Sequence, residues 1–171
     1  MNSMDEERDR VDRIIEQWRR ERPDLDPTAK GVTGRVVRIG DLIQARMGDA
    51  LAPLGIRDGD YGLLSALRRS GDPFEQSPTE LRQHLVITSG GLTLQLERLE
   101  RAGLVQRRPN PADGRSVLVR LTPEGRALAD EAMERHAALE HEMVAGLTSE
   151  ERDVLVGLLR KLLGSLDAAA T

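Results

Sequence analysis

The side chains best suited to bind another molecule are concentrated in the middle of the chain, which is more basic than either end. Residues 79–120 contain seven arginines against four acidic residues, a net charge of +3. The rest of the chain holds 18 basic and 25 acidic residues, a net charge of −7. The distribution of charge matters more than its sum of −4. This basic segment therefore predicts contact with the phosphates of DNA.

A run of small and polar residues inside this segment has the composition of a helix that reads DNA. Serine and threonine hydroxyls can bond to phosphates or base edges, and a glutamine can pair with adenine through two hydrogen bonds. Two adjacent glycines would let the helix backbone approach DNA closely, although they are also compatible with a tight turn between helices. The candidate contacts in this run are Ser89, Gly90, Gly91, Thr93, Leu94, Gln95 and Arg98.

A predicted hairpin follows this helix and carries a second group of candidate contacts. Two strands, 104–108 and 116–121, flank a stretch rich in turn residues, 109–114. Asp113 lies two residues before Arg115 and can orient it, and a protruding arginine suits a narrow minor groove. The alternative is a solvated turn with a surface ion pair. The candidate contacts in the hairpin are Arg107, Arg108, Asp113, Arg115 and Ser116.

A helix-turn-helix is predicted to hold the first group in place. The motif Ser77-Pro78-Thr79-Glu80 combines a capping serine, a proline at the first helical position and a glutamate that completes a capping box. It begins a short helix that ends near residue 85, and a tight turn leads to the second helix at 88–102. Ser77 and Thr79 lie at the start of the short helix and are further candidate DNA contacts. Helix, turn, helix and hairpin together predict a winged helix-turn-helix.

Helices at both ends complete a mainly α fold with a helical dimerisation region. Apolar residues at helical spacing predict helices near residues 11–18, 27–47, 61–67, 122–144 and 148–166, the second of them capped by Asp26. One small winged lobe cannot cover all the apolar stripes of the first and last helices, which predicts a homodimer. We expect dimerisation helices at 1–54, a DNA-binding lobe at 55–121 and further dimerisation helices at 122–171, within one compact domain.

Several classes of function are disfavoured by the composition. The chain has no cysteine, which excludes disulfides and thiolate metal sites. It also lacks a phosphate-binding loop, a nucleophile motif or a metal-ligand cluster, so we expect no cofactor, no metal, no catalytic residue and no enzymatic activity. No apolar run approaches the roughly 18 residues of a membrane span, and the polar first ten residues do not form a secretory signal. A cytoplasmic location is the default expectation.

These residues also carry a family resemblance. The sequence Leu-x-Arg-Leu-Glu-x-x-Gly-Leu-Val at 96–105, then Asp-Gly-Arg-Ser at 113–116 and Leu-Thr-x-x-Gly at 121–125, resembles the MarR family of bacterial transcriptional regulators. The resemblance covers nearly the whole chain. It implies a triangular homodimer with terminal helices at its interface and two winged lobes that read a palindromic operator. It also implies a repressor that is released by a small ligand or an oxidant.

The N-terminal third resembles a urate-responsive subgroup that has an extra first helix. The resemblance implies that Trp18 and Arg69 line a ligand pocket, while the aspartate and recognition-helix arginine of the subgroup are replaced by Gly62 and Gln95. We therefore expect a small aromatic or anionic effector other than urate. The simpler interpretations are a packed interface aromatic for Trp18 and a solvated helix end for Arg69. Asp60 is near Gly62, but two residues along a helix point elsewhere.

Two other functions are compatible with the same fold. A winged helix can be a protein-interaction module that does not bind DNA, or a DNA-binding protein that responds to no ligand. The arginine at the tip of the predicted hairpin argues against the first, because an interaction module does not need it. The extra first helix, which would add a second shell to the dimer, favours a ligand-responsive regulator over the second.

Overall fold

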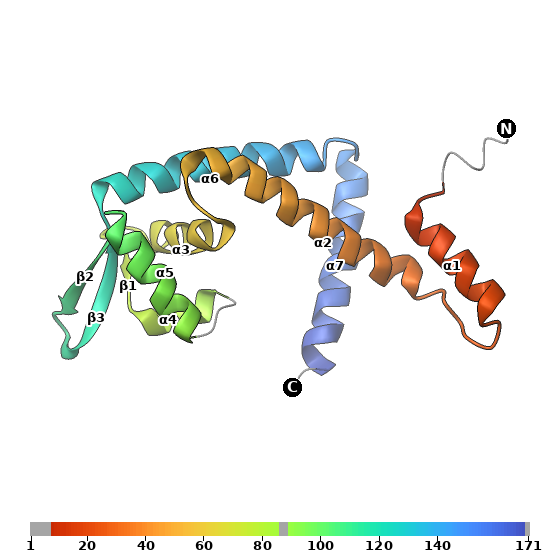
Figure 1. The fold of residues 1–171 in the computed structure, drawn as a ribbon, viewed down its shortest axis with the longest axis horizontal. Helices are drawn as coiled ribbons and strands as arrows, with labels where there is room; N and C mark the ends of the chain where they lie inside the picture. The colour runs from red at the N-terminus through yellow and green to blue at the C-terminus, as the bar shows by residue number, and fades with distance from the viewer. Residues whose placement is uncertain (1–7, 86–88, 170–171) are drawn as a thin grey trace. The chain divides into compact units, whose positions relative to one another are not determined.

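The computed structural model describes residues 8–85 and 89–169, with the side chains of Ser89, Gly114 and Arg115 outside the description. The chain divides into two compact units, one ending at Arg46 and one starting at Met47. Along the chain (Figure 1) the elements are α1 (Arg10–Glu21), α2 (Lys30–Leu51), η1 (Ala52–Leu54), α3 (Asp58–Arg69), β1 (Glu75–Gln76), α4 (Pro78–His84), α5 (Ser89–Arg101), β2 (Val105–Asn110), β3 (Asp113–Leu121), α6 (Pro123–Met143) and α7 (Ser149–Ala169).

The first unit pairs α1 with the beginning of α2. Val11 of α1 is buried, and a Cβ added at Gly34 of α2 would lie 3.1 Å from Val11 Cγ1. The two helices therefore approach closely at Gly34. Arg35, the next residue, donates to Asp9 (2.8 Å) and to Asp12 (2.7 Å). The hydrogen bond from Arg35 is the main reason that the pKa of Asp12 lies below its usual value. The Gly34-Arg35 pair is thus a structural clamp between the two helices.

The start of α2 differs from the prediction. Asp26 accepts a hydrogen bond from the Thr28 backbone at 3.0 Å, but the regular helix begins only at Lys30. The intervening backbone forms i→i+3 bonds, such as Lys30 N to Pro27 O at 3.1 Å, which tighten the chain into a turn. Asp26 therefore caps a turn that precedes the helix and not the helix itself.

The second unit contains a winged helix fold, as predicted. Its core consists of side chains from α3, α4, α5, β3 and the end of α2 that are almost inaccessible to solvent, namely Leu51, Leu63, Leu64, Leu67, Leu81, Leu99 and Val119. Tyr61 is partly buried against this core and stacks on His136 of α6 with 4.4 Å between ring centroids. The helices with a clear apolar stripe were predictable because the stripe fixes which face is buried.

A three-stranded antiparallel sheet, in the order β1-β3-β2, contains the wing, which is the hairpin of β2 and β3. The two long strands pair further toward their tip than predicted: Asn110 lies opposite Asp113, and only Pro111 and Ala112 form the turn. The Asn110 side chain extends the pairing, because it accepts from Ala112 N at 3.0 Å and donates to Ser116 Oγ at 3.0 Å. The prediction missed β1, since a strand of two residues has no detectable alternation.

The start of α6 is tightly joined to the end of α5. Thr122 caps α6 through its hydroxyl, which accepts from Gly125 N at 2.9 Å and donates to Gly103 O at 2.7 Å. A Cβ at Gly125 would lie 1.8 Å from the carbonyl oxygen of Leu104. The glycine of the Leu-Thr-x-x-Gly motif therefore lies where the backbone of α6 contacts the backbone of Leu104 directly.

The last helix, α7, has no buried residue within the chain. Its exposed apolar side chains are Val154, Leu155, Val156, Leu158, Leu159, Leu163 and Leu166. Such a long apolar surface is unusual on a monomer. Among the described residues, no helix combines the length and apolar character that a membrane crossing needs.

Candidate nucleic-acid interface

Helix α4 is fixed at its first turn by the predicted capping box. Ser77 Oγ accepts from Glu80 N at 3.2 Å, and Glu80 Oε2 accepts from Ser77 N at 2.7 Å. The hydrogen bond from the Ser77 backbone lowers the pKa of Glu80 below its usual value. Ser77 thus has a structural role, while Thr79 is exposed on the same turn. The predicted turn at 86–88 lies outside the described residues.

The outer face of α5 is small and partly apolar. Gly90, Thr93 and Leu94 are exposed, and Leu94 has 65% of its surface accessible. A leucine presented in this way can contact a thymine methyl group in the major groove. A Cβ at Gly90 would meet nothing within 4 Å, so packing inside the chain does not require a glycine there. This favours close approach to DNA over a tight turn; Gly91, beside it, is partly buried, and the Ser89 side chain lies outside the described residues.

Two predicted contacts on α5 point inward instead. Gln95 is only 5% exposed and packs over Gly59, where its Nε2 would lie 3.0 Å from an added Cβ. Arg98 donates to Asp60 of α3, whose carboxylate is almost fully buried. Gln95 is therefore covered by α3, which contradicts its predicted contact with adenine, whereas Arg98 is held by Asp60 with 38% of its side chain still exposed.

The wing tip is organised by side chains that prediction assigned to DNA or overlooked. Ser116 Oγ donates to Asp113 O at 3.1 Å and accepts from Asn110, so its hydroxyl is used within the turn. Asn110 belongs to the predicted turn-rich stretch, as is typical of asparagine, but its bonds to Ala112 and Ser116 were not predicted. The backbone of Arg115 belongs to β3, but its side chain, and with it the predicted pair with Asp113, lies outside the described residues.

The two arginines at the base of the wing have different surroundings. Arg107 has its Nε 3.7 Å from Glu100 of α5, a longer contact than that of Arg108, and 36% of its side chain is exposed. Arg108 donates to Glu75 of β1, and this hydrogen bond raises the pKa of Arg108 further above its usual value. Arg108 therefore joins β2 to β1; its side chain is 37% exposed, about as much as the 36% of Arg107, and its predicted contact with DNA stays a prediction.

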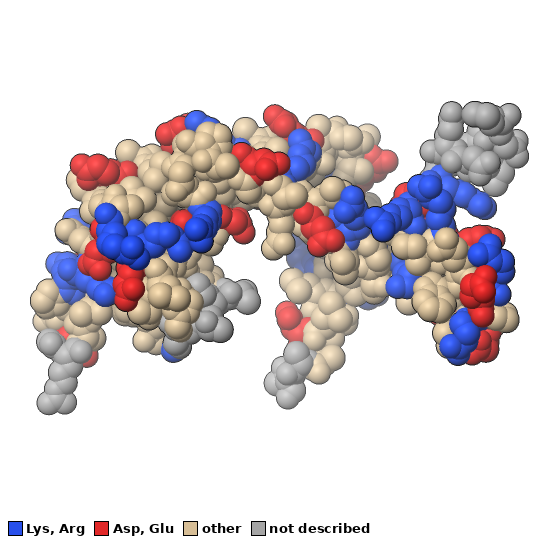
Figure 2. Space-filling view, in the orientation of Figure 1, with Lys and Arg blue, Asp and Glu red and all other residues tan. Residues whose placement is uncertain are grey.

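A cleft of about 420 Å³ lies between α4, α5 and the wing. It brings together Thr79, Thr93 and Arg107, three of the predicted contacts, with Arg82 and the exposed Val117. In the space-filling view (Figure 2), a band of basic side chains crosses the lobe around α3 and α5, with acidic side chains beside it. The lobe thus presents basic and hydroxyl side chains from sequence-distant elements on the helix-turn-helix and wing together.

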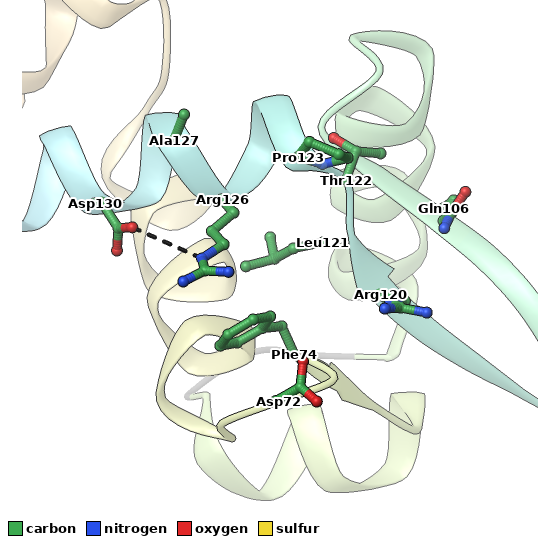
Figure 3. Close-up of a pocket in the computed structure, with 10 residues that line it drawn as sticks. All are labelled: Asp72, Phe74, Gln106, Arg120, Leu121, Thr122, Pro123, Arg126, Ala127 and Asp130. Atoms are coloured by element: carbon green, nitrogen blue, oxygen red, sulfur yellow. Dashed lines mark ion pairs between the residues drawn. The ribbon is translucent and has the colours of Figure 1, made fainter.

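A second cleft, of about 620 Å³, lies where β3 meets α6 (Figure 3). Phe74 forms its floor, and the Arg126 guanidinium lies over the ring at 4.5 Å from the centroid. Arg68 approaches the same ring at 4.9 Å and also donates to Asp130 at 2.6 Å. These contacts tie α3 to α6, because Arg68 and Arg126 share both the Phe74 ring and the Asp130 carboxylate.

The residues predicted to hold an effector belong to different units. Trp18 lies on α1 and is 43% exposed, so it is not a buried core residue of this chain. Arg69 is the last residue of α3 and is exposed. At Gly62 an added Cβ would make an ordinary contact of 3.5 Å with Leu85. We expected Asp60 to point away from the side of α3 that carries Gly62. Its carboxylate accepts a hydrogen bond from Arg98 of α5.

Comparisons with known proteins agree with the winged helix fold of the second unit. A model of the MarR family matches residues 54–116. The transcriptional regulator PecS of Dickeya dadantii is 36% identical over 152 residues, which cover 89% of this chain and 92% of PecS. A mutant MarR of E. coli in complex with operator DNA has a TM-score of 0.69 at 31% identity, covering 81% of this chain and 99% of that one. BpsR of Bordetella bronchiseptica, whose DNA binding is regulated by 6-hydroxynicotinic acid, has a TM-score of 0.67 at 29% identity, covering 77% and 91%.

Proposed function

The chain belongs to the MarR family, whose members related to it are transcriptional regulators, and we propose that it represses transcription by binding a pseudo-palindromic operator as a homodimer. Residues 55–121 form the DNA-binding lobe in this proposal, and 1–54 and 122–171 supply dimerisation helices. The observation that carries it is the exposed face of α5, with Gly90, Thr93 and Leu94, next to a wing with Arg107 at its base. Like its relatives, the chain is proposed to be a regulator and not an enzyme, and to act in the cytoplasm.

The operator can be found by selecting bound fragments from random duplex DNA. Binding of the selected duplex is then compared for the wild type, Thr93→Ala and Leu94→Ala in a mobility-shift titration. Glu134→Gln, an exposed change on α6, serves as a control. We expect the two α5 variants to bind more weakly and the control to bind like the wild type. Failure to enrich any sequence, or unchanged binding in both α5 variants, would contradict the proposal.

Dimerisation is supported by the exposed apolar surface of α7. Burying it between two chains removes apolar area from water, which stabilises by about 25 cal/mol per Å². The two-fold axis of the dimer would match the symmetry of the operator. Light scattering at micromolar concentration should give twice the 18.9 kDa chain mass, and Leu159→Glu should lower that mass. A folded wild-type monomer is incompatible with the proposal.

The regulator is further proposed to release DNA when a small aromatic or anionic effector binds, with Trp18 and Arg69 as the two contacts that the family resemblance implies. Support comes from the resemblance to the urate-responsive subgroup and its extra first helix, and from the aromatic acid that regulates BpsR. An effector acts only if it prefers a dimer whose lobes are wrongly spaced for DNA, and operator DNA must then weaken effector binding by the same factor.

Trp18 is the only tryptophan, so its fluorescence reports binding at this place. A panel of aromatic carboxylates and purines should contain a compound that quenches Trp18 and releases DNA, and Arg69→Ala should abolish both effects. Because Gly62 and Gln95 replace an aspartate and an arginine, urate should bind weakly or not at all. If no compound of the panel acts, the site is structural only. If urate acts at low micromolar concentration, the inference from the two replacements is wrong.

A further inference from the structure

Buried polar atoms without a hydrogen-bond partner occur at two contacts within the described part of the chain. Four side-chain atoms are buried and unpartnered there: Glu75 Oε2, Gln95 Oε1, Arg98 Nε and Arg108 Nε. Both contacts join a carboxylate of the lobe's body to an arginine on an element that faces DNA in the proposed function. Because some buried polar atoms at these contacts lack a hydrogen-bond partner, the geometry of each contact is sensitive to a change in either side chain.

The first contact attaches the recognition helix α5 to the N-terminus of α3. Asp60, whose side chain is only 4% exposed, accepts from the Arg57 backbone at 3.1 Å with one oxygen and from Arg98 with the other. One turn earlier on α5, the Gln95 amide packs over Gly59. The Asp60 carboxylate thus caps α3 and also fixes the position of α5 against α3.

The second contact attaches the wing to the first strand. Glu75 of β1, whose side chain is 12% exposed, accepts from Arg108 of β2. These strands are not neighbours, because β3 lies between them in the sheet. The pair therefore spans the sheet and holds the outer strand of the wing relative to the strand that leads into α4.

We propose that Asp60 and Glu75 are positioning residues for DNA binding. They act through Arg98 and Arg108 to hold the recognition helix and the wing in the one relative arrangement that lets both reach the operator. Without the carboxylate, an arginine whose Nε is buried and whose side chain is less than 40% exposed loses its partner and shifts toward water. The helix or strand that carries it moves as well. Binding sites tolerate errors of only about 0.5 Å in such groups.

This inference rests on the proposed function and predicts an effect with an unexpected sign. Both residues are acids, and removing an acidic charge from a DNA-binding lobe should strengthen binding to phosphates if electrostatics alone acted. A positioning role predicts instead that removing either acid weakens binding to the operator. The sign of the change in affinity therefore distinguishes the two explanations.

The experiment compares Asp60→Asn and Glu75→Gln with Glu97→Gln, which removes an exposed acid from α5 and so reports the electrostatic effect alone. Fluorescence anisotropy measures binding to the selected operator and to a scrambled duplex, and circular dichroism measures the folded fraction. We expect operator binding at least fivefold weaker in the first two variants, with scrambled-duplex binding unchanged or stronger. Glu97→Gln should bind both duplexes as tightly as the wild type or more tightly.

The outcomes separate this inference from the proposed function. A wild type that binds no duplex contradicts the function, whereas a wild type that binds, with folded variants as tight as Glu97→Gln, overturns the positioning role. An equal loss on both duplexes also overturns it, because a general loss reports less folded protein. If Asp60→Asn does not fold, Glu75→Gln decides alone, since its strand has two residues and lies at the edge of the sheet.

Discussion

Replacing Gly125 by alanine should destabilise the protein strongly, although alanine normally favours a helix. Gly125 lies in the first turn of α6, and its new Cβ would be 1.8 Å from Leu104 O, where real Cβ contacts are essentially never under 3.0 Å. The backbone fixes the position of a Cβ, and Leu104 O is a backbone atom, so no side-chain rotation can relieve the contact. The start of α6 must move away from Leu104, which strains the bond from Thr122 N to Leu104 O, now 3.1 Å long.

Overpacking of this kind costs about 1–3 kcal/mol, and a backbone-to-backbone clash belongs at the upper end. The gain in helix propensity opposes this by about 1 kcal/mol, which leaves a net loss of about 2 kcal/mol. For a chain of this size the midpoint of thermal unfolding should fall by roughly 4–8 °C.

Thermal and urea unfolding of Gly125→Ala can be compared with Gly146→Ala, whose added Cβ would meet nothing within 4 Å. The control should be as stable as the wild type. An equal or higher midpoint in Gly125→Ala would refute the close contact between α6 and Leu104.

Two further changes test the DNA-reading helix pair. Gly90→Ala should leave stability unchanged or slightly raised, since its Cβ would meet nothing within 4 Å in the chain. It should weaken operator binding in a mobility-shift assay, because the added methyl group holds the helix backbone off the DNA. Normal operator binding would favour the interpretation of the two glycines as a tight turn. Glu80→Gln should reduce stability at about pH 7 more than at about pH 3. The folded-state pKa of Glu80 is lowered, so its contribution is present above the unfolded-state pKa and is lost as the pH falls through the folded-state value. An equal effect at both pH values in urea titrations would contradict the capping role.

Local patterns predicted most of the fold. The capping box at Ser77, the helical spacing of apolar residues at 148–166 and the turn residues between the two predicted strands depend on residues a few positions apart, and the structure contains the expected elements at each place. The strand β1 and the late start of α2 were missed because their signals are two or three residues long.

The roles of Gln95, Arg98 and Arg108 could not be predicted in the same way. Arg98 pairs with a residue 38 positions away, and Arg108 with one 33 positions away. A local sequence pattern shows that a helix has two faces, but a polar residue next to the apolar stripe can lie on either. The packing of α3 against α5 decides that Gln95 is buried and that Arg98 pairs with Asp60.

Operator binding by the wild type and Arg115→Ala, measured as a function of salt concentration, tests the central claim most directly. If the wing and recognition helix bind DNA, the logarithm of the wild-type association constant should fall linearly with the logarithm of salt concentration, with a slope of about −0.9 for each phosphate contacted. Loss of an arginine that enters a groove should weaken binding by about 1–3 kcal/mol. Binding that is independent of salt, together with unchanged affinity in Arg115→Ala, would contradict the claim that this lobe binds DNA through its wing.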